Sequence, residues 1–389
     1  MKKKAIAVIF FALWAGVLVS QPARAAEDAR SGENIRPDIQ YGFWDWQCLD
    51  SFLEPPVEKV PPRKAMQITP SPGSPVAPWK QPDPALASLP FHYLEVIDQR
   101  VPLYPTLDAA VAKKKPSRHL IPGFTYVSFD NQVLVKGKWY YRISSQFWMP
   151  GGEAAYLGTL PTFQGLVFEE TPGADFGWVL VEVESQSSPG GGVSSSTGKI
   201  YQRYDVVWVL EKGSQGGVDY LRVGEGEWIP ADYVGSVTLQ NGPPQGVEGD
   251  RWIDINLEQQ TLAVYDQGEL AFATLVSTGV EGNWTRPGTF QIETKKGTEL
   301  MRGSFAADLS DYYYLEDVPW TMYFDQMRAL HGTYWHDSFG RPHSRGCVNL
   351  SPGDAHWLFD WAEEGDWVHV HDPSGETPVD PELYHPGGA

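Results

Sequence analysis

The stretch HGTYWHDSFGRPHSRGCVNL, residues 331–350, holds one of the two cysteines of the chain and three of its histidines. A cysteine nucleophile needs a base within hydrogen-bond reach and main-chain N–H donors for the oxyanion that attack produces. His331 can serve as the base, and Gly346 allows the backbone to approach a substrate closely. The amides of Gly346 and Cys347 can then face the developing charge. This stretch therefore predicts a catalytic thiol.

Three other roles for Cys347 fit the sequence less well. His336, His343 and Asp337 share its loop, but they lack the compact ligand pairs of a zinc site, so we expect neither a metal nor a cofactor. A disulfide with Cys48 is chemically possible, although no local sequence feature favours it. A buried apolar cysteine fits poorly beside its glycine and polar neighbours. Nucleophilic catalysis remains the leading hypothesis.

The elements around this loop are expected to be strands and one helix. Ser351 is a helix N-cap, Pro352 suits the first turn, and AHWLFDWAEEG carries the helix to a glycine stop. The N-terminal dipole of this helix would favour a thiolate. Residues 251–279 alternate polar and apolar side chains around a turn at 266–268, which predicts paired strands, and DWVHVHD (366–372) predicts a final strand.

The motif resembles the signature of L,D-transpeptidases with a YkuD-type catalytic domain, in which His-Gly and a spacer precede Ser-x-Gly-Cys-x-Asn. The matching residues here are His331-Gly332 and Ser344-Arg345-Gly346-Cys347-Val348-Asn349. WIDINLEQQTLAVYDQGELAFATLVSTG and TRPGTF are also typical of that family. The likeness extends from Arg251 to about Asp372.

The resemblance implies a role for each matching position. Cys347 would be the nucleophile and His331 the general base, with the Gly332 carbonyl orienting the imidazole. The residues expected to brace the loop or to form the oxyanion hole are Ser344, Gly346 and Asn349. Arg345 replaces a histidine found in many relatives, so its role would be electrostatic or orienting. Tyr323 and Met322 would line the substrate channel, unless they pack in the core.

The same resemblance implies a peptidoglycan substrate and stem peptides as partners. Cys347 would attack a tetrapeptide stem, release D-alanine and form a thioester, and an amine on a second stem would capture the thioester as a 3-3 cross-link. One alternative is an L,D-carboxypeptidase of the same fold, which uses water as the acceptor. Another is a non-catalytic cell-wall-binding protein.

An internal repeat precedes this region. YYRISSQFWMP (140–150) and YLRVGEGEWIP (220–230) align without a gap at a spacing of 80 residues, which indicates a duplicated unit. Each copy resembles the closing strands of bacterial SH3-like barrels. We therefore expect a mainly β protein: an SH3-like domain at 89–165, another at 166–240, and a YkuD-type β-sandwich at 249–372 with one helix after the catalytic loop.

The N-terminus predicts export. Three lysines, a short apolar run and Ala-Arg-Ala form a signal peptide over residues 1–25, followed by an extension with a Pro-rich linker at 26–88; residues 373–389 form a polar tail. No later stretch is apolar enough to span a membrane. The net charge of −19 argues against a nucleic-acid partner. We expect a protein of the cell envelope, in the periplasm or cell wall, and the oligomeric state stays open.

Overall fold

The computed structural model describes residues 79–384, except 98–99, 122, 153–154 and 159. The predicted signal peptide, most of the predicted extension and Cys48 lie outside the described residues, as do residues 385–389 of the tail. The described part is mainly β, as the sequence predicts, with five sheets and few helices. It holds no helix that is long and apolar enough to cross a membrane.

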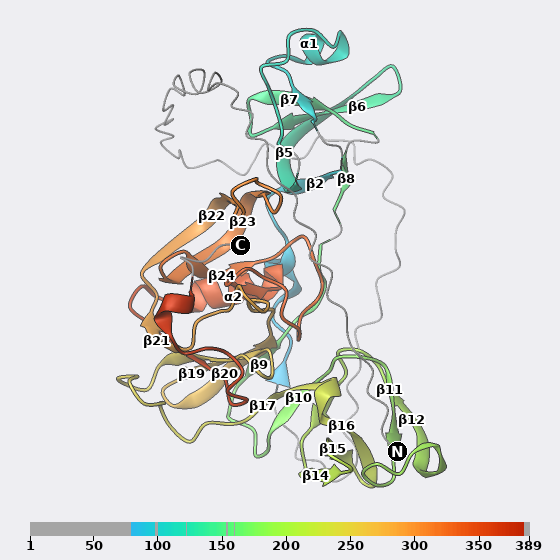
Figure 1. The fold of residues 1–389 in the computed structure, drawn as a ribbon, viewed down its shortest axis with the longest axis vertical. Helices are drawn as coiled ribbons and strands as arrows, with labels where there is room; N and C mark the ends of the chain where they lie inside the picture. Colours follow the sequence, from blue (N-terminus) through green and yellow to red (C-terminus); the bar gives the residue numbers. More distant parts are fainter. Residues whose placement is uncertain (1–78, 98–99, 122, 153–154, 159, 385–389) are drawn as a thin grey trace, which may run out of the picture. The chain divides into compact units, whose positions relative to one another are not determined.

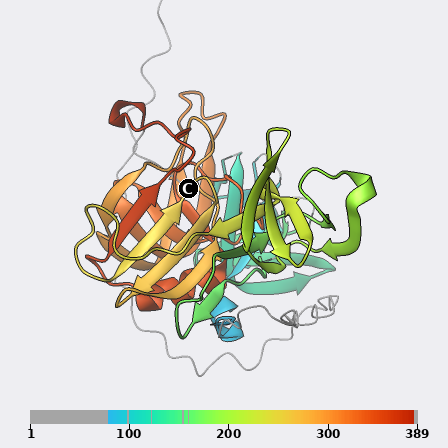
Figure 2. The ribbon, with the colours of Figure 1, turned by 90° about the horizontal axis from the view of Figure 1, so that it is seen from below.

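Two sheets carry most of residues 250–370, coloured yellow to red in Figures 1 and 2. The seven-stranded sheet has the order β1 (Trp79–Lys80), β9 (Leu166–Phe168), β20 (Glu269–Leu275), β19 (Thr261–Asp266), β18 (Trp252–Asn256), β26 (Trp367–His371) and β21 (Gly288–Gln291). The nine-stranded sheet has the order β25 (Val348–Leu350), β24 (Arg328–Gly332), β23 (Tyr313–Asp325), β5 (Phe124–Val135), β2 (His92–Val96) and β8 (Ala155–Leu157), with β22 (Thr294–Gly303), β6 (Lys138–Ile143) and β7 (Phe147–Pro150) attached.

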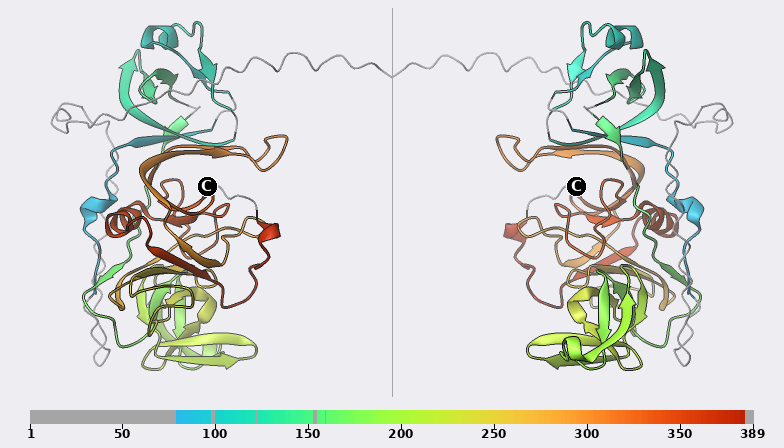
Figure 3. Two further views of the ribbon diagram at one scale, coloured as in Figure 1. Left: turned by 90° about the vertical axis from the view of Figure 1, so that its left-hand side faces the viewer. Right: turned by 90° about the vertical axis from the view of Figure 1, so that its right-hand side faces the viewer.

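The main core lies between these sheets and is covered by the helix α2 (Pro352–Trp361). Its members are apolar and buried, among them Ile253, Leu262, Phe272, Phe324, Leu330 and Leu358. The helix starts as the sequence predicts, because the Ser351 side chain accepts a hydrogen bond from the Asp354 amide at 3.3 Å. The 3-10 helix η2 (Pro84–Ala87) lies beside α2 (Figure 3), where His356 Nδ1 is 3.1 Å from the Leu86 carbonyl oxygen.

The remaining elements, apart from a short 3-10 helix near the C-terminus, belong to the two segments before residue 250. The first segment adds β3 (Pro102–Leu103), β4 (Arg118–His119) and α1 (Leu107–Val111). The second contains one sheet of β13 (Val206–Trp208), β10 (Phe176–Val179) and β17 (Val234–Val237), and another of β12 (Ser196–Tyr201), β11 (Val183–Gln186), β16 (Glu227–Pro230), β15 (Val218–Gly224) and β14 (Glu211–Gln215). Three further 3-10 helices are η3 (Val193–Ser195), η4 (Ala231–Tyr233) and η5 (Pro381–Leu383).

The two copies of the repeat form the hairpins β6–β7 and β15–β16, which share their register except next to the turn, where the second copy has an irregularity. Arg142 pairs with Trp148 in the first hairpin, and Arg222 pairs with Trp228 in the second. Each arginine also meets a carboxylate on the preceding strand, at 2.7 Å from Asp130 in the first copy and at 2.8 Å from a glutamate in the second. The repeated sequence thus encodes a repeated local structure.

The first segment is joined to the nine-stranded sheet close to His331. Strand β5 runs parallel to the start of β23, and the Ser128 amide donates to the buried Glu316 carboxylate at 3.1 Å. Ser144 donates to the same carboxylate at 2.8 Å. Tyr93 of β2 stacks on Tyr334 with ring centres 3.6 Å apart. Since Tyr334 lies three residues after His331, this segment supports the loop that carries the histidine.

Candidate active site

A parallel strand pair brings His331 and Cys347 to one face. In the β24–β25 pair, Leu330 is opposite Val348 and His331 is opposite Asn349. Side chains alternate between the two faces of a strand. Cys347, two positions before Asn349 and just outside β25, therefore points to the same side as His331. The sheet register, rather than the loop between the strands, sets their relative position.

The His331 imidazole is held as a neutral base. The side chain is fully buried, and Nδ1 lies 3.1 Å from the Gly332 carbonyl oxygen, so Nδ1 carries the proton and donates it. The other nitrogen, Nε2, has no hydrogen-bond partner within the described residues. Burial lowers the pKa of His331 to about 4, and the Gly332 carbonyl opposes this only in part. At neutral pH the ring offers an unprotonated Nε2.

The Cys347 thiol is also buried and neutral. Its sulfur lies 3.7 Å from the Met327 carbonyl oxygen. Burial raises the pKa of Cys347 to about 11, although the Ala329 amide and the positive charge of Arg328 act in the opposite direction. Desolvation of the charged sulfur therefore outweighs the favourable effect of these two groups in the ligand-free protein.

The residues just before the cysteine form a tight, cross-braced turn. The Ser344 hydroxyl donates to the Cys347 carbonyl at 2.5 Å and accepts from the Gly346 amide at 3.1 Å. The Thr285 hydroxyl donates to the Gly346 carbonyl at 2.9 Å. Gly346 has a φ of +118°, a conformation that strains any other residue. Because Ser344 already engages the Gly346 amide, the Cys347 amide is the better candidate for an oxyanion donor.

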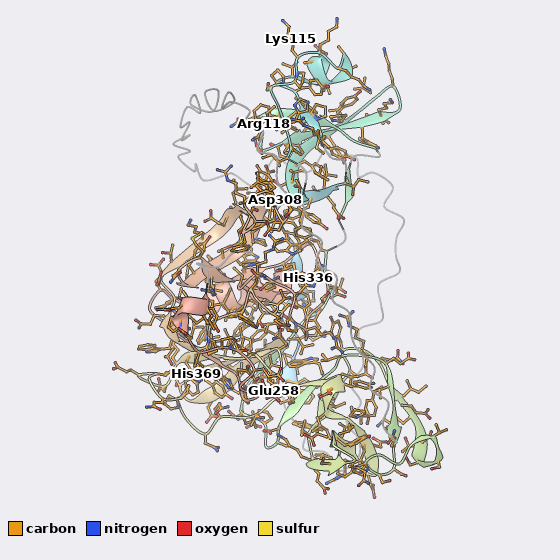
Figure 4. The ribbon with its side chains drawn as sticks, in the orientation of Figure 1. Lys115, Arg118, Glu258, Asp308, His336 and His369 are labelled. Atoms are coloured by element: carbon orange, nitrogen blue, oxygen red, sulfur yellow. The ribbon has the colours of Figure 1, made fainter. Side chains whose placement is uncertain are left out.

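Asn349 contacts a histidine to which the sequence assigned no catalytic role. Its Nδ2 lies 2.9 Å from Nε2 of His336, whose Nδ1 accepts from the Ser338 amide at 3.1 Å. A neutral imidazole that accepts at Nδ1 carries its proton on Nε2. Rotating the Asn349 amide by a half turn places its oxygen, otherwise without a partner in the described part of the chain, opposite that proton. His336 is labelled in Figure 4.

The other histidine of the loop stacks near this pair without forming a metal site. The rings of His343 and His336 are centred 4.1 Å apart. Burial lowers the pKa of both imidazoles, to about 3 for His336. Within the described ranges, no group of three or more His, Cys, Asp or Glu side chains is placed to hold a metal ion.

Two arginines flank the cysteine loop. Arg345 donates from Nη1 to the Asp311 carbonyl at 2.6 Å, and its guanidinium lies over the Tyr313 ring. Arg328 is only 3% exposed and forms an ion pair with Asp325 at 3.1 Å. Sequence reasoning missed Arg328, although a charged residue in the otherwise apolar segment MRALHG was a usable signal.

The two residues expected to line a substrate channel differ in placement. Met322 is fully buried in the core between the sheets, which is the packing role that the sequence left open. Its neighbour Tyr323 points to the other side of β23 and is half-buried. Burial raises the pKa of Tyr323, and the charges of Glu299 and Cys347 add to this effect. Tyr323 is therefore close enough to the thiol to interact with it.

The comparisons with known proteins agree on one part of the chain. Residues 250–370 match the family model of the YkuD L,D-transpeptidase catalytic domain. L,D-transpeptidase 1 of Mycobacterium tuberculosis is 26% identical over 185 residues, which cover 41% of this chain and 72% of that protein. The segments before residue 250 are not identified by a family.

Solved structures were matched as well. An L,D-transpeptidase from Stackebrandtia nassauensis is 29% identical, with a TM-score of 0.27, over 35% of this chain and 60% of that one. The chain thus spans less than two thirds of that relative. The catalytic domain of the E. faecium L,D-transpeptidase is 26% identical, with a TM-score of 0.29, over 32% of this chain and all of that one. The assignment of residues 250–370 rests on the family match.

Proposed function

Residues 250–370 are an L,D-transpeptidase catalytic domain of the YkuD family, a family of cysteine transpeptidases, and from this premise we propose that the protein forms 3-3 cross-links in peptidoglycan. The donor is a tetrapeptide stem, and D-alanine is released. One observation supports this most directly: a neutral imidazole, whose Nε2 has no hydrogen-bond partner among the described residues, shares a strand face with a buried thiol.

In the acylation step, Nε2 of His331 takes the proton of the Cys347 thiol as the sulfur attacks the carbonyl of the third stem residue. The C–S bond forms and the carbonyl oxygen becomes an oxyanion, which the Cys347 amide stabilises. Collapse of this intermediate breaks the C–N bond. The leaving amine of D-alanine takes the proton from His331, so the enzyme is left as a thioester with a neutral imidazole.

In the second step an amine on a neighbouring stem attacks the thioester. His331 accepts a proton from this amine and returns it to the sulfur as the new amide bond forms. Water as the acceptor would instead release a tripeptide, which is the carboxypeptidase outcome.

The proposal also covers the cellular location of the protein and the bounds of its domains. Export by the segment at 1–25 would bring the protein to the cell envelope, where its substrate lies. We assign the hairpins β6–β7 and β15–β16 to SH3-like units at 89–165 and 166–240, because they share register and an arginine–carboxylate pair. The catalytic domain would extend over 249–372.

The test is the mass of the intact protein after incubation with a tetrapeptide donor. We expect an adduct equal to the donor minus D-alanine, located on Cys347 by peptide mapping. Addition of a second stem should then yield a dimer, whereas a tripeptide alone would indicate a carboxypeptidase. The absence of any adduct on Cys347 under conditions in which the protein is folded would contradict the proposal.

A further inference from the structure

A small cavity beside the cysteine loop is lined by two cationic side chains. Arg328 and Arg345 face it, together with Trp284, Phe305, Leu383 and Tyr384. Its volume of about 10 Å³ is close to the space that one water molecule requires. Tyr384 follows η5, so this segment near the C-terminus borders the cavity.

Arg328 lies directly against the loop that presents the nucleophile. A Cβ atom added at Gly346 would be 3.2 Å from Nε of Arg328. The same nitrogen lies 3.4 Å from the Trp284 carbonyl oxygen. The guanidinium charge also counteracts the rise in the pKa of Cys347. A positive charge is therefore held within reach of whatever is bound to the sulfur.

Arg328 shares its carboxylate partner with a second arginine. Asp325 forms ion pairs with both Arg328, at 3.1 Å, and the half-buried Arg286, at 2.5 Å. The nearby Asp311 carboxylate accepts from the Ser304 hydroxyl and from two main-chain amides. A guanidinium that shares its carboxylate gains from a further anion or polarisable group beside it.

Tyr384 supplies such a polarisable group for Arg328. Its ring lies over the Arg328 guanidinium, with 5.2 Å between the carbon of that group and the ring centre, and its edge approaches Trp284. A ring over a guanidinium stabilises it electrostatically, but less than a carboxylate does. A carboxylate would therefore bind the Arg328 guanidinium more strongly than the Tyr384 ring does.

We propose that Arg328 and Arg345 form a subsite for the terminal carboxylate of the donor peptide, which Tyr384 covers until the donor displaces it. This inference rests on the proposed function. In a donor that loses its C-terminal residue, three bonds of about 1.33, 1.46 and 1.52 Å separate the attacked carbonyl carbon from the carboxylate carbon. The carboxylate must therefore lie within about 4 Å of the attacked carbon, in the immediate surroundings of Cys347.

The experiment compares two donors that differ at one group: a tetrapeptide with a free C-terminal D-alanine carboxylate and the same peptide as a C-terminal amide. We expect kcat/KM for acylation of Cys347 to be about 10- to 100-fold lower for the amide, the range for loss of a hydrogen bond to a charged group. Arg345→Gln and Arg328→Gln should remove this preference by slowing the acid donor alone. Arg341→Gln, an exposed arginine on the same loop, is the matched control and should retain the preference.

Tyr384→Ala should lower KM for the acid donor more than for the amide donor, because the uncovered guanidinium groups attract the charged carboxylate more strongly. This variant and Arg345→Gln, both at half-buried positions, decide the question if Arg328→Gln does not fold. Equal rates for the two donors in the unmodified protein would overturn the subsite, as would equal losses for both donors in Arg345→Gln. If neither donor acylates Cys347, the proposed function fails and the subsite fails with it.

Discussion

The pH dependence of acylation follows from the burial of the two reacting groups. Cys347 has a pKa of about 11 and His331 a pKa of about 4. Moving the proton from sulfur to nitrogen before substrate arrives would cost roughly 10 kcal/mol, at about 1.4 kcal/mol per pKa unit and before the attraction between the resulting charges is counted. The resting pair is therefore uncharged, and proton transfer accompanies attack.

We predict that kcat/KM for acylation is flat from about pH 5 to pH 9 and falls about tenfold per pH unit below pH 4, as the His331 base becomes protonated. Rapid-quench mass measurements at constant ionic strength would give this profile. A preformed thiolate–imidazolium pair would instead give an acid limb with an apparent pKa between 6 and 8. That result would refute the neutral-pair argument.

Folding must be monitored over the same range, because the same histidine affects stability. Its pKa is about 4 in the folded protein and 6.5 in the unfolded chain, so between these values the unfolded chain binds more protons. The stability associated with His331 is present above pH 6.5 and is lost as the pH falls towards 4, by about 3 kcal/mol. Circular dichroism at each pH separates unfolding from protonation of the base.

Three substitutions test the site itself. His331→Gln should slow acylation by about 10² to 10⁴-fold, while His343→Gln should cost much less; equal losses would mean that the base is misassigned. Gly332→Ala should destabilise the protein by about 1–3 kcal/mol in urea unfolding, because the new Cβ would lie 2.9 Å from Cγ of Pro319, and an unchanged midpoint would show that this contact relaxes freely. Cys347→Ser should keep the fold and abolish the donor adduct in the intact-mass assay, since a hydroxyl is a far weaker nucleophile.

Local signals in the sequence predicted the elements that hold the site. The Ser351 cap and Pro352 located the start of α2, and the alternation of residues 251–279 located β18 to β20. These features depend on neighbours in the chain. The predicted catalytic residues lie in one short motif, so the sequence also indicated that they are close together.

The sequence held no comparable signal for the pairing of strands that lie far apart in the chain. The parallel contact between Phe124–Tyr126 and Tyr313–Leu315 joins segments almost 190 residues apart, and it depends on which strand edges remain open after each unit forms. The pairing of β9 with β20 is of the same kind. Arg328 was missed for a related reason: its role becomes visible only when Asp325, Gly346 and Tyr384 surround it.

The burial of Cys347 has a consequence for the lifetime of the protein in an oxidising space. Peroxide and disulfide exchange act on an accessible thiolate, whereas the ligand-free folded chain buries this sulfur and raises its pKa. An unfolded chain, with an ordinary thiol pKa and free access, has no such protection. Folding therefore slows the oxidation of Cys347 relative to the unfolded chain.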